Sequence, residues 1–165
     1  MPAATYAIAI GSNRPGRHGR PEAEVRAAIA GLGGIIAVSR IFATPPLGPS
    51  SRRYANAVAI LESTESPPAL LARLKNIERA FGRRAGRRWG ARVIDLDIIL
   101  WSGGVHVDTA LGTGLTIPHP SFRARRFVLD PLEALVPRWR DPVTGLTVRQ
   151  LAARVRAVDQ RPYRS

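Results

Sequence analysis

The chain has 165 residues, 45% of them hydrophobic, and a formal net charge of +13 from 25 basic and 12 acidic residues. This size and composition exclude a disordered or membrane-spanning chain and predict one globular domain. No apolar run approaches the roughly 20 residues that span a bilayer, and the N-terminus lacks the features of a signal peptide, so we expect a cytoplasmic protein. The absence of cysteine excludes disulfides, zinc–thiolate sites and thiol catalysis.

The basic excess indicates a polyanionic partner, and its local clustering is more informative than its total. All basic residues except Lys75 are arginine, a bias that base composition alone can produce. Five of them fall within ten residues, namely Arg83, Arg84, Arg87, Arg88 and Arg92. The planar guanidinium suits pairs of phosphate oxygens, so this stretch predicts a basic loop that contacts phosphates.

The predicted elements follow from residue periodicity and from proline and glycine signals. In chain order we expect a strand over 5–10, a helix over 21–32, strands over 35–44 and 54–61, a helix over 67–81 and a strand over 94–101. This order predicts an α+β fold, a ferredoxin-like split βαβ sandwich whose antiparallel sheet carries helices on one face. The other face is then left for function.

Beyond residue 101 the pattern is weaker. We expect a short strand near Val105 and helical pieces around 130–135 and 147–155, wrapped on the same core. The chain is therefore interpreted as a single domain, 1–165, with a core over about 5–137 and a C-terminal helical extension over 138–165.

The segment 94–100 carries two aspartates two residues apart. Alternate residues of a strand share a face, so Asp95 and Asp97 are expected to stand side by side. The other face would bury Ile94, Leu96, Ile98 and Leu100. Two such carboxylates suit magnesium ions that also bind phosphates. The alternative is a solvated strand face with arginine partners; proximity to the arginine cluster favours the metal.

Three further features suit a planar ligand, each with a structural alternative. Trp89, inside the basic stretch, either stacks on a ligand or folds back on the core. Tyr54 and Asn56 share a strand face, and the Asn56 amide offers a donor and an acceptor to a heterocycle, or else forms a cross-strand bond. The proline-rich segment 44–49 is either a wall of a site or only a rigid turn.

Together these features resemble the 6-hydroxymethyl-7,8-dihydropterin pyrophosphokinase family from Ala7 to about Pro137. The motifs that carry the resemblance are Gly11-Ser12-Asn13, Thr44-Pro45-Pro46-Leu47-Gly48, Tyr54 with Asn56, Arg88-Trp89-Gly90, Asp95-Leu96-Asp97-Ile98, and Pro118-His119-Pro120 followed by Arg125 and Phe127. The resemblance implies transfer of the diphosphate of ATP to the hydroxymethyl group of the reduced pterin, with release of AMP, in folate biosynthesis.

The resemblance also implies roles for individual residues. Asp95 and Asp97 would bind two Mg²⁺ ions, and Arg83 and Arg92 would join them in the catalytic set. Pterin contacts would come from Thr44, Pro45, Leu47, Tyr54, Asn56, Trp89 and Phe127. ATP contacts would come from Glu78, Arg83, Arg88, Arg92, Ile98, Thr116, His119 and Arg125. The expected partners are ATP and the pterin, without nucleic acid or membrane, and the chain is expected to be a monomer.

Four positions depart from the family pattern: Lys75, Ala91, Val93 and Gly114. Two other functions stay open. A nucleic-acid-binding module can share this fold, but the aromatic strand motif of such modules is missing and two carboxylates would repel a phosphate backbone. A relative that binds pterin or nucleotide without turnover is disfavoured by the presence of both aspartates, Trp89 and Arg92.

Overall fold

The computed structural model describes residues 2–44, 54–82, 93–108 and 114–160. Its strands are β1 (Ala4–Ser12), β2 (Ile35–Val38), β3 (Phe42–Thr44), β4 (Tyr54–Ser63), β5 (Asp95–Trp101), β6 (His106–Val107) and β7 (Thr116–Ile117). Its helices are α1 (Pro21–Leu32), α2 (Pro67–Ala80), α3 (Arg126–Leu135) and α4 (Val148–Asp159), with a 3₁₀ turn, η1 (Phe122–Ala124). Within these residues, no helix is long and apolar enough to cross a bilayer.

The main sheet has the strand order β2-β4-β1-β5, and every pairing in it is antiparallel. The expected mixed fold with an antiparallel sheet is therefore confirmed. The single strand predicted over 35–44 is wrong, because it divides into β2 and β3, both paired with β4. At the break, the Ser39 hydroxyl accepts a hydrogen bond from the Val58 N–H at 2.9 Å, so a side chain replaces one backbone acceptor.

The expected helices α1 and α2 are confirmed, and their ends have local causes. Pro21 begins α1, and Gly33 ends it with a φ of 68°, in the left-handed region that glycine adopts easily. The Ser66 side chain caps α2 by accepting a hydrogen bond from the Ala69 N–H.

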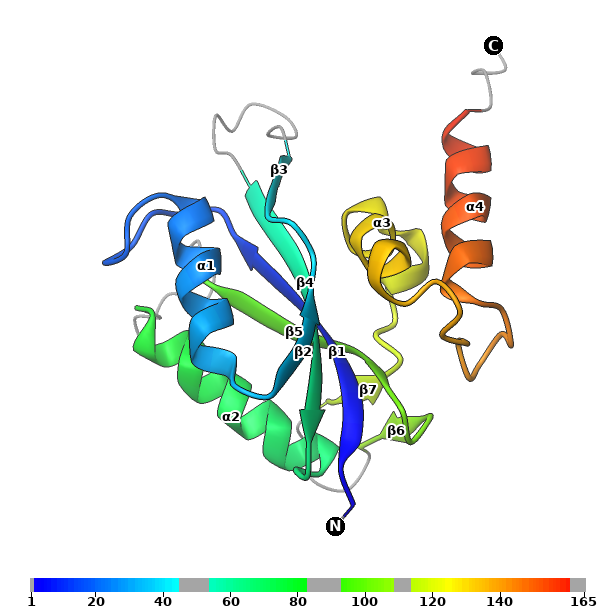
Figure 1. Ribbon diagram of the computed structural model, residues 1–165, viewed down its shortest axis with the longest axis horizontal. Coiled ribbons are helices and arrows are strands. Elements are labelled where there is room, and N and C mark those ends of the chain that lie inside the picture. The colour runs from blue at the N-terminus through cyan, green and yellow to red at the C-terminus, as the bar shows by residue number, and fades with distance from the viewer. Residues whose placement is uncertain (1, 45–53, 83–92, 109–113, 161–165) are drawn as a thin grey trace.

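Helices cover both faces of the sheet (Figure 1), so the expectation that they cover only one is wrong. On one face, α1 and α2 bury strand residues such as Ile8, Ala57 and Leu96. On the other, α3 and α4 bury Val58 and Ile60. The strands are apolar on both faces over part of their length, and that part requires a second helical cover.

A β-bulge in β5 explains a further difference from the predicted alternation. The register between β1 and β5 pairs Ile8 with Ile98 but Ala7 with Leu100, so Ile99 is the extra residue. Leu100 was expected on the same face as Leu96, yet it lies in the core beneath α3 and α4. The bulge thus moves the end of β5 onto the opposite face.

Candidate active site

A cavity of about 370 Å³ lies between the sheet and the segment that leads into α3. It opens where β1 ends and where β4 and β5 begin. Its lining consists of Ala9, Ile10, Gly11, Ser12, Asn13, Tyr54, Asn56, Ala57, Asp95, Asp97, Ile99, His119, Phe122, Arg125, Phe127 and Val128. Seven of the residues predicted from the sequence are therefore brought together: Tyr54, Asn56, Asp95, Asp97, His119, Arg125 and Phe127.

The register of the sheet fixes the spacing of the polar groups in the cavity. Gly11 of β1 pairs with Asn56 of β4 on one side and with Asp95 of β5 on the other. Two strand spacings therefore separate Asn56 from Asp95, about 10 Å at the Cα atoms. An amide at one end and carboxylates at the other suit a ligand with a neutral heterocycle at one end and, where divalent cations lie between it and the carboxylates, phosphates at the other.

Small residues of β1 keep the space between these groups open. Gly11 lies in the row of Asn56 and Asp95, and Ala9 pairs with Asp97 in the next row. A Cβ atom at Gly11 would stand 3.2 Å from the Asn56 Oδ1, a tighter contact than is usual. The glycine therefore allows the close approach of the Asn56 amide to the sheet.

Asp95 and Asp97 form the only strongly acidic part of this lining, and both project toward the cavity from β5. Asp95 is exposed and Asp97 is partly buried. Among the residues that the structure describes, no group of three or more side chains could hold a metal ion. Two carboxylates fit magnesium, which usually takes one or two from the protein and completes its octahedral shell with phosphate oxygens and water.

His119 presents a neutral imidazole to the cavity. Burial lowers the pKa of His119 below its ordinary value of 6.5; the Asp97 charge opposes this shift and the Arg125 charge adds to it. The Ser121 N–H donates to Nδ1 at 3.1 Å, so the neutral ring carries its proton on Nε2. The His119 N–H donates to the Ile99 carbonyl at 3.0 Å, which ties this segment to the bulge in β5.

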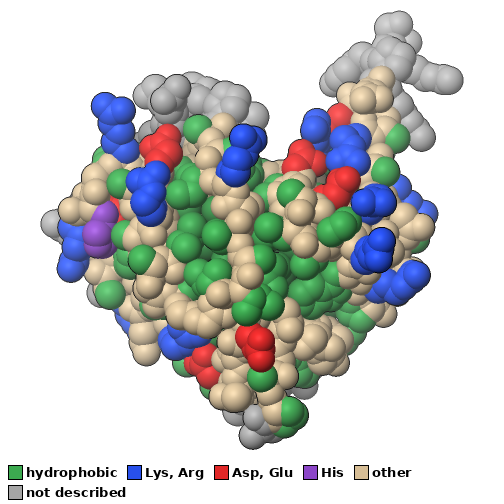
Figure 2. All heavy atoms as spheres, in the orientation of Figure 1, with side chains coloured by type: hydrophobic (Ala, Val, Ile, Leu, Met, Phe, Trp, Pro, Cys, Tyr) green, Lys and Arg blue, Asp and Glu red, His purple; other side chains and the backbone are tan. Residues whose placement is uncertain are grey.

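Aromatic side chains supply the apolar surface of the cavity. Phe122 is fully buried, whereas Tyr54 and Phe127 are 39% and 41% exposed. The Arg125 guanidinium lies 5.7 Å from the centroid of the Phe127 ring. Exposed rings beside a cavity are available to stack on a planar ligand. On the face of the molecule that Figure 2 draws, hydrophobic side chains gather in the middle, with charged side chains around them.

Three predicted site residues, Glu78, Ile98 and Thr116, do not line the cavity. Glu78 of α2 is buried, and its carboxylate accepts a hydrogen bond from the Leu96 N–H at 2.9 Å. It thereby anchors β5 between the two aspartates. Ile98 is buried beneath α1 and α2. Thr44 and Thr116 belong to β3 and β7, where they pair with Tyr54 and Val107.

The remaining predicted residues are Pro45, Leu47, Arg83, Arg88, Trp89 and Arg92, which lie outside the described ranges. The sequence prediction also missed several residues of the lining, chiefly Ala9, Ile99, Phe122 and Val128. Ala9 could have been found, because it shares a strand face with Gly11. Phe122 and Val128 carry no motif of their own, and only tertiary packing brings them to the cavity.

Known proteins of one family are similar to this chain. Residues 7–137 match the family model described as 7,8-dihydro-6-hydroxymethylpterin-pyrophosphokinase. Two relatives are named 2-amino-4-hydroxy-6-hydroxymethyldihydropteridine pyrophosphokinase. The Synechocystis protein is 43% identical over 108 residues, which are 66% of this chain and 53% of that protein. The Pseudomonas aeruginosa protein is 37% identical over 141 residues, 82% of each chain.

Solved structures agree in fold. A structure titled as HPPK-DHPS in complex with substrates has a TM-score of 0.76 at 12% identity and covers 99% of this chain. Plasmodium falciparum HPPK-DHPS has a TM-score of 0.72 at 14% identity and covers 96% of it. The chain spans only 46% and 42% of those two proteins. From the match of the family model and the identity with these relatives, the chain belongs to the 7,8-dihydro-6-hydroxymethylpterin-pyrophosphokinase family.

Proposed function

We propose that this chain transfers the diphosphate of ATP to the hydroxymethyl group of 6-hydroxymethyl-7,8-dihydropterin in folate biosynthesis. The hydroxymethyl oxygen forms a bond to the β-phosphorus as the bond to the bridging oxygen of AMP breaks, and the hydroxyl proton is released. The observation that carries this proposal is one cavity that holds an amide and two carboxylates about two strand spacings apart. The names of the relatives support the same reaction.

The pterin would bind at the β4 side of the cavity. The Asn56 amide can donate to and accept from the edge of the heterocycle, and Tyr54 and Phe127 offer exposed rings to its plane. Thr44, Pro45, Leu47 and Trp89 complete the proposed pterin contacts. This arrangement directs the hydroxymethyl group toward β5 and its aspartates.

The triphosphate would bind at the β5 side, where Asp95 and Asp97 would hold two Mg²⁺ ions. When bound, the ions would neutralise phosphate charge and orient the β-phosphorus toward the attacking hydroxyl. His119, through Nε2–H, and Arg125 would donate to phosphate or nucleotide oxygens. We also assign Arg83, Arg88, Arg92 and Thr116 to the ATP side, with Arg83 and Arg92 stabilising the charge that develops during transfer. Glu78 and Ile98, which are both buried, would act there indirectly by holding β5 in place.

Four broader features belong to the same proposal. The strand order β2-β4-β1-β5, antiparallel throughout, supports a ferredoxin-like split βαβ sandwich. The family match over 7–137 supports a single pyrophosphokinase domain with an extension over 138–165. We further propose that the chain is a monomer and acts in the cytoplasm.

A direct assay tests the proposed reaction. The full chain is incubated with ATP, Mg²⁺ and 6-hydroxymethyl-7,8-dihydropterin, and AMP is quantified by chromatography. We expect AMP to form in equal amount to the pterin diphosphate, and only when pterin and Mg²⁺ are both present. Release of ADP, or AMP formation that does not depend on pterin, would contradict the proposal.

Replacing Asn56 by alanine tests the pterin end of the cavity. The variant loses at least two hydrogen bonds to the heterocycle, so we expect the KM for pterin to rise by about 30-fold or more while the KM for ATP stays within about twofold. Asn76→Ala is the matched control, because Asn76 is exposed on α2. Steady-state kinetics of both variants make the comparison, and equal KM values for pterin would remove Asn56 from the site.

A further inference from the structure

The C-terminal helix α4 lies beyond the residues matched by the family model, yet it packs on α3. Val148, Leu151 and Ala152, all in the first half of α4, are buried in the same apolar core as Leu129 and Leu132 of α3. This apolar contact fixes the N-terminal half of α4. In the second half of the helix, the partly buried Val155 also packs against this core.

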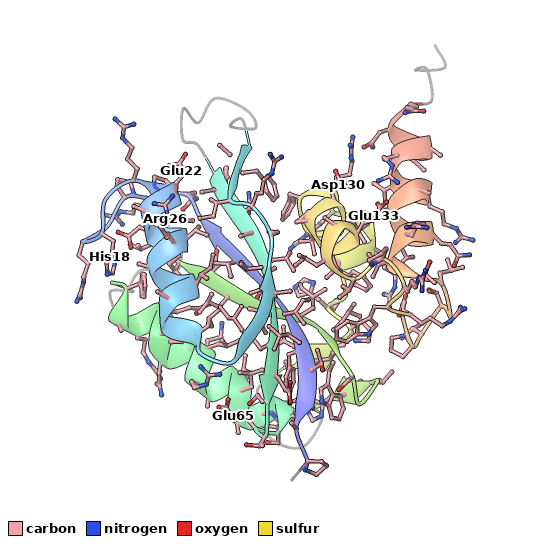
Figure 3. The ribbon with its side chains drawn as sticks, viewed as in Figure 1. His18, Glu22, Arg26, Glu65, Asp130 and Glu133 are labelled. Atoms are coloured by element: carbon pink, nitrogen blue, oxygen red, sulfur yellow. The ribbon has the colours of Figure 1, made fainter. Side chains whose placement is uncertain are left out.

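The second half of α4 reaches α3 through charged side chains. Arg156 donates to both carboxylate oxygens of Glu133, at 2.8 and 3.4 Å, and to Asp130 at 3.4 Å. Arg126 donates to Asp130 at 3.3 Å and to Asp159 at 3.4 Å. Figure 3 labels Asp130 and Glu133 on α3, on the part of the molecule that faces α4. These side chains form one connected network between the two helices.

The network lies directly behind the cavity wall. Arg126, a member of the network, stands in sequence between Arg125 and Phe127, which both line the cavity. Asp130 follows Phe127 by three residues, so the two lie near each other on the surface of α3. Any movement of the first turns of α3 therefore moves Arg125 and Phe127.

On its other side, α3 faces open space. A groove of about 740 Å³ separates its first turns from the sheet edge formed by β2 and β3. Val38 and Phe42 line the groove from the sheet, opposite Phe127 and Asp130. Val128 and Leu129 anchor these turns in the core, and on the side of α4 the charged contacts of Arg156 and Arg126 support them as well.

We propose that Arg156 is a positioning residue for the reaction: from α4 it holds the first turns of α3, and so holds Phe127 and Arg125 in place at the cavity. This inference rests on the proposed function. Exposed ion pairs contribute little to the free energy of unfolding, so we expect Arg156 to affect the position of the first turns of α3 more than the stability of the fold. Small displacements of binding groups are enough to weaken substrate binding strongly.

The test compares Arg156→Gln with Arg154→Gln. Arg154 is exposed on the same helix and forms no ion pair with any residue that the structure describes. For Arg156→Gln we expect the KM for pterin to rise about fivefold with kcat within about twofold, and faster amide hydrogen exchange over residues 125–130. The control should match the parent in both measurements.

Two additional variants make the result decisive. Glu133→Gln should reproduce both changes, and the double variant with Arg156→Gln should add almost nothing, because both substitutions break the same contact. Unchanged exchange over 125–130 in Arg156→Gln, or a fall in melting temperature without a change in KM, would overturn the proposal. The exchange measurement needs no turnover, so it shows whether Arg156 holds the first turns of α3 even if the proposed reaction fails its own assay.

Discussion

Substitution of Asp97 by asparagine is expected to reduce Mg²⁺-dependent AMP formation on the order of a thousandfold. Asp97 is one of two carboxylates that line the cavity, and it lies in the strand row next to Asp95. With only one carboxylate left, the protein could not hold the two proposed divalent cations against the triphosphate, and such charge neutralisation provides most of the catalysis in this class of reaction. Initial rates measured over a range of Mg²⁺ concentrations test the expectation.

The fold should not suffer from this change. Asp95 and Asp97 carry like charges on one strand face, so removing one charge relieves repulsion and should leave the free energy of unfolding equal or slightly higher. Glu62→Gln is the matched control, because Glu62 is an exposed carboxylate of β4 near the other end of the sheet. Near-normal turnover in Asp97→Asn with intact melting behaviour would remove the aspartate pair from the mechanism.

The second large effect concerns stability. Asp141 is completely buried in the turn before α4, where its carboxylate accepts hydrogen bonds from the Arg123 guanidinium, the Val143 N–H and the Thr144 hydroxyl. Replacing Asp141 by alanine leaves these donors without their acceptor, so we expect the free energy of unfolding to fall by about 3 kcal/mol. Urea denaturation measures the loss. Asp159→Asn, which breaks an exposed ion pair, should cost less than about 1 kcal/mol.

The same carboxylate predicts an acid dependence. Burial raises the pKa of Asp141, but the hydrogen bonds from Arg123, Val143 and Thr144 outweigh burial and lower the pKa from 3.8 to about 2. A folded-state pKa below the unfolded one stabilises the protein above pH 3.8, and this contribution is lost as the pH falls toward 2. The shift corresponds to about 2 kcal/mol. Asp141→Ala should lack this part of the acid destabilisation; an unchanged pH profile would contradict the assignment.

Features set by local sequence were predictable. The apolar runs of β1 and β4, the apolar stripe of α2 and the glycine signal that ends α1 at Gly33 follow from a few neighbouring residues, and the structure has those elements. The shared face of Asp95 and Asp97 also follows from strand geometry alone. For the same reason, the two-residue spacing of Tyr54 and Asn56 predicts that both lie on the strand face that lines the cavity.

Features set by tertiary packing were not predictable. Nothing near Phe122 or Val128 in the sequence shows that these residues close a cavity formed by β1, β4 and β5. The cover of the sheet by α3 and α4 was missed because the strand residues beneath them are distant in sequence. Val58 and Ile60 of β4 lie more than 50 residues before α3, and irregular segments separate β5 from α3. The anchoring of Leu96 by Glu78 depends on the docking of α2 on β5, which spacing does not reveal.

The extra residue in β5, Ile99, divides the strand into two parts with different roles. Before Ile99 the strand orients Asp95 and Asp97, and after it Leu100 packs in the core beneath α3 and α4. A substitution in one part therefore need not disturb the packing of the other. The Ile99 carbonyl, displaced from regular pairing, is also where the His119 backbone attaches. Deleting Ile99 would restore regular pairing between β1 and β5 and would leave Asp95 and Asp97 in position. It would also remove the hydrogen bond that attaches the His119 backbone to the strand of the two aspartates.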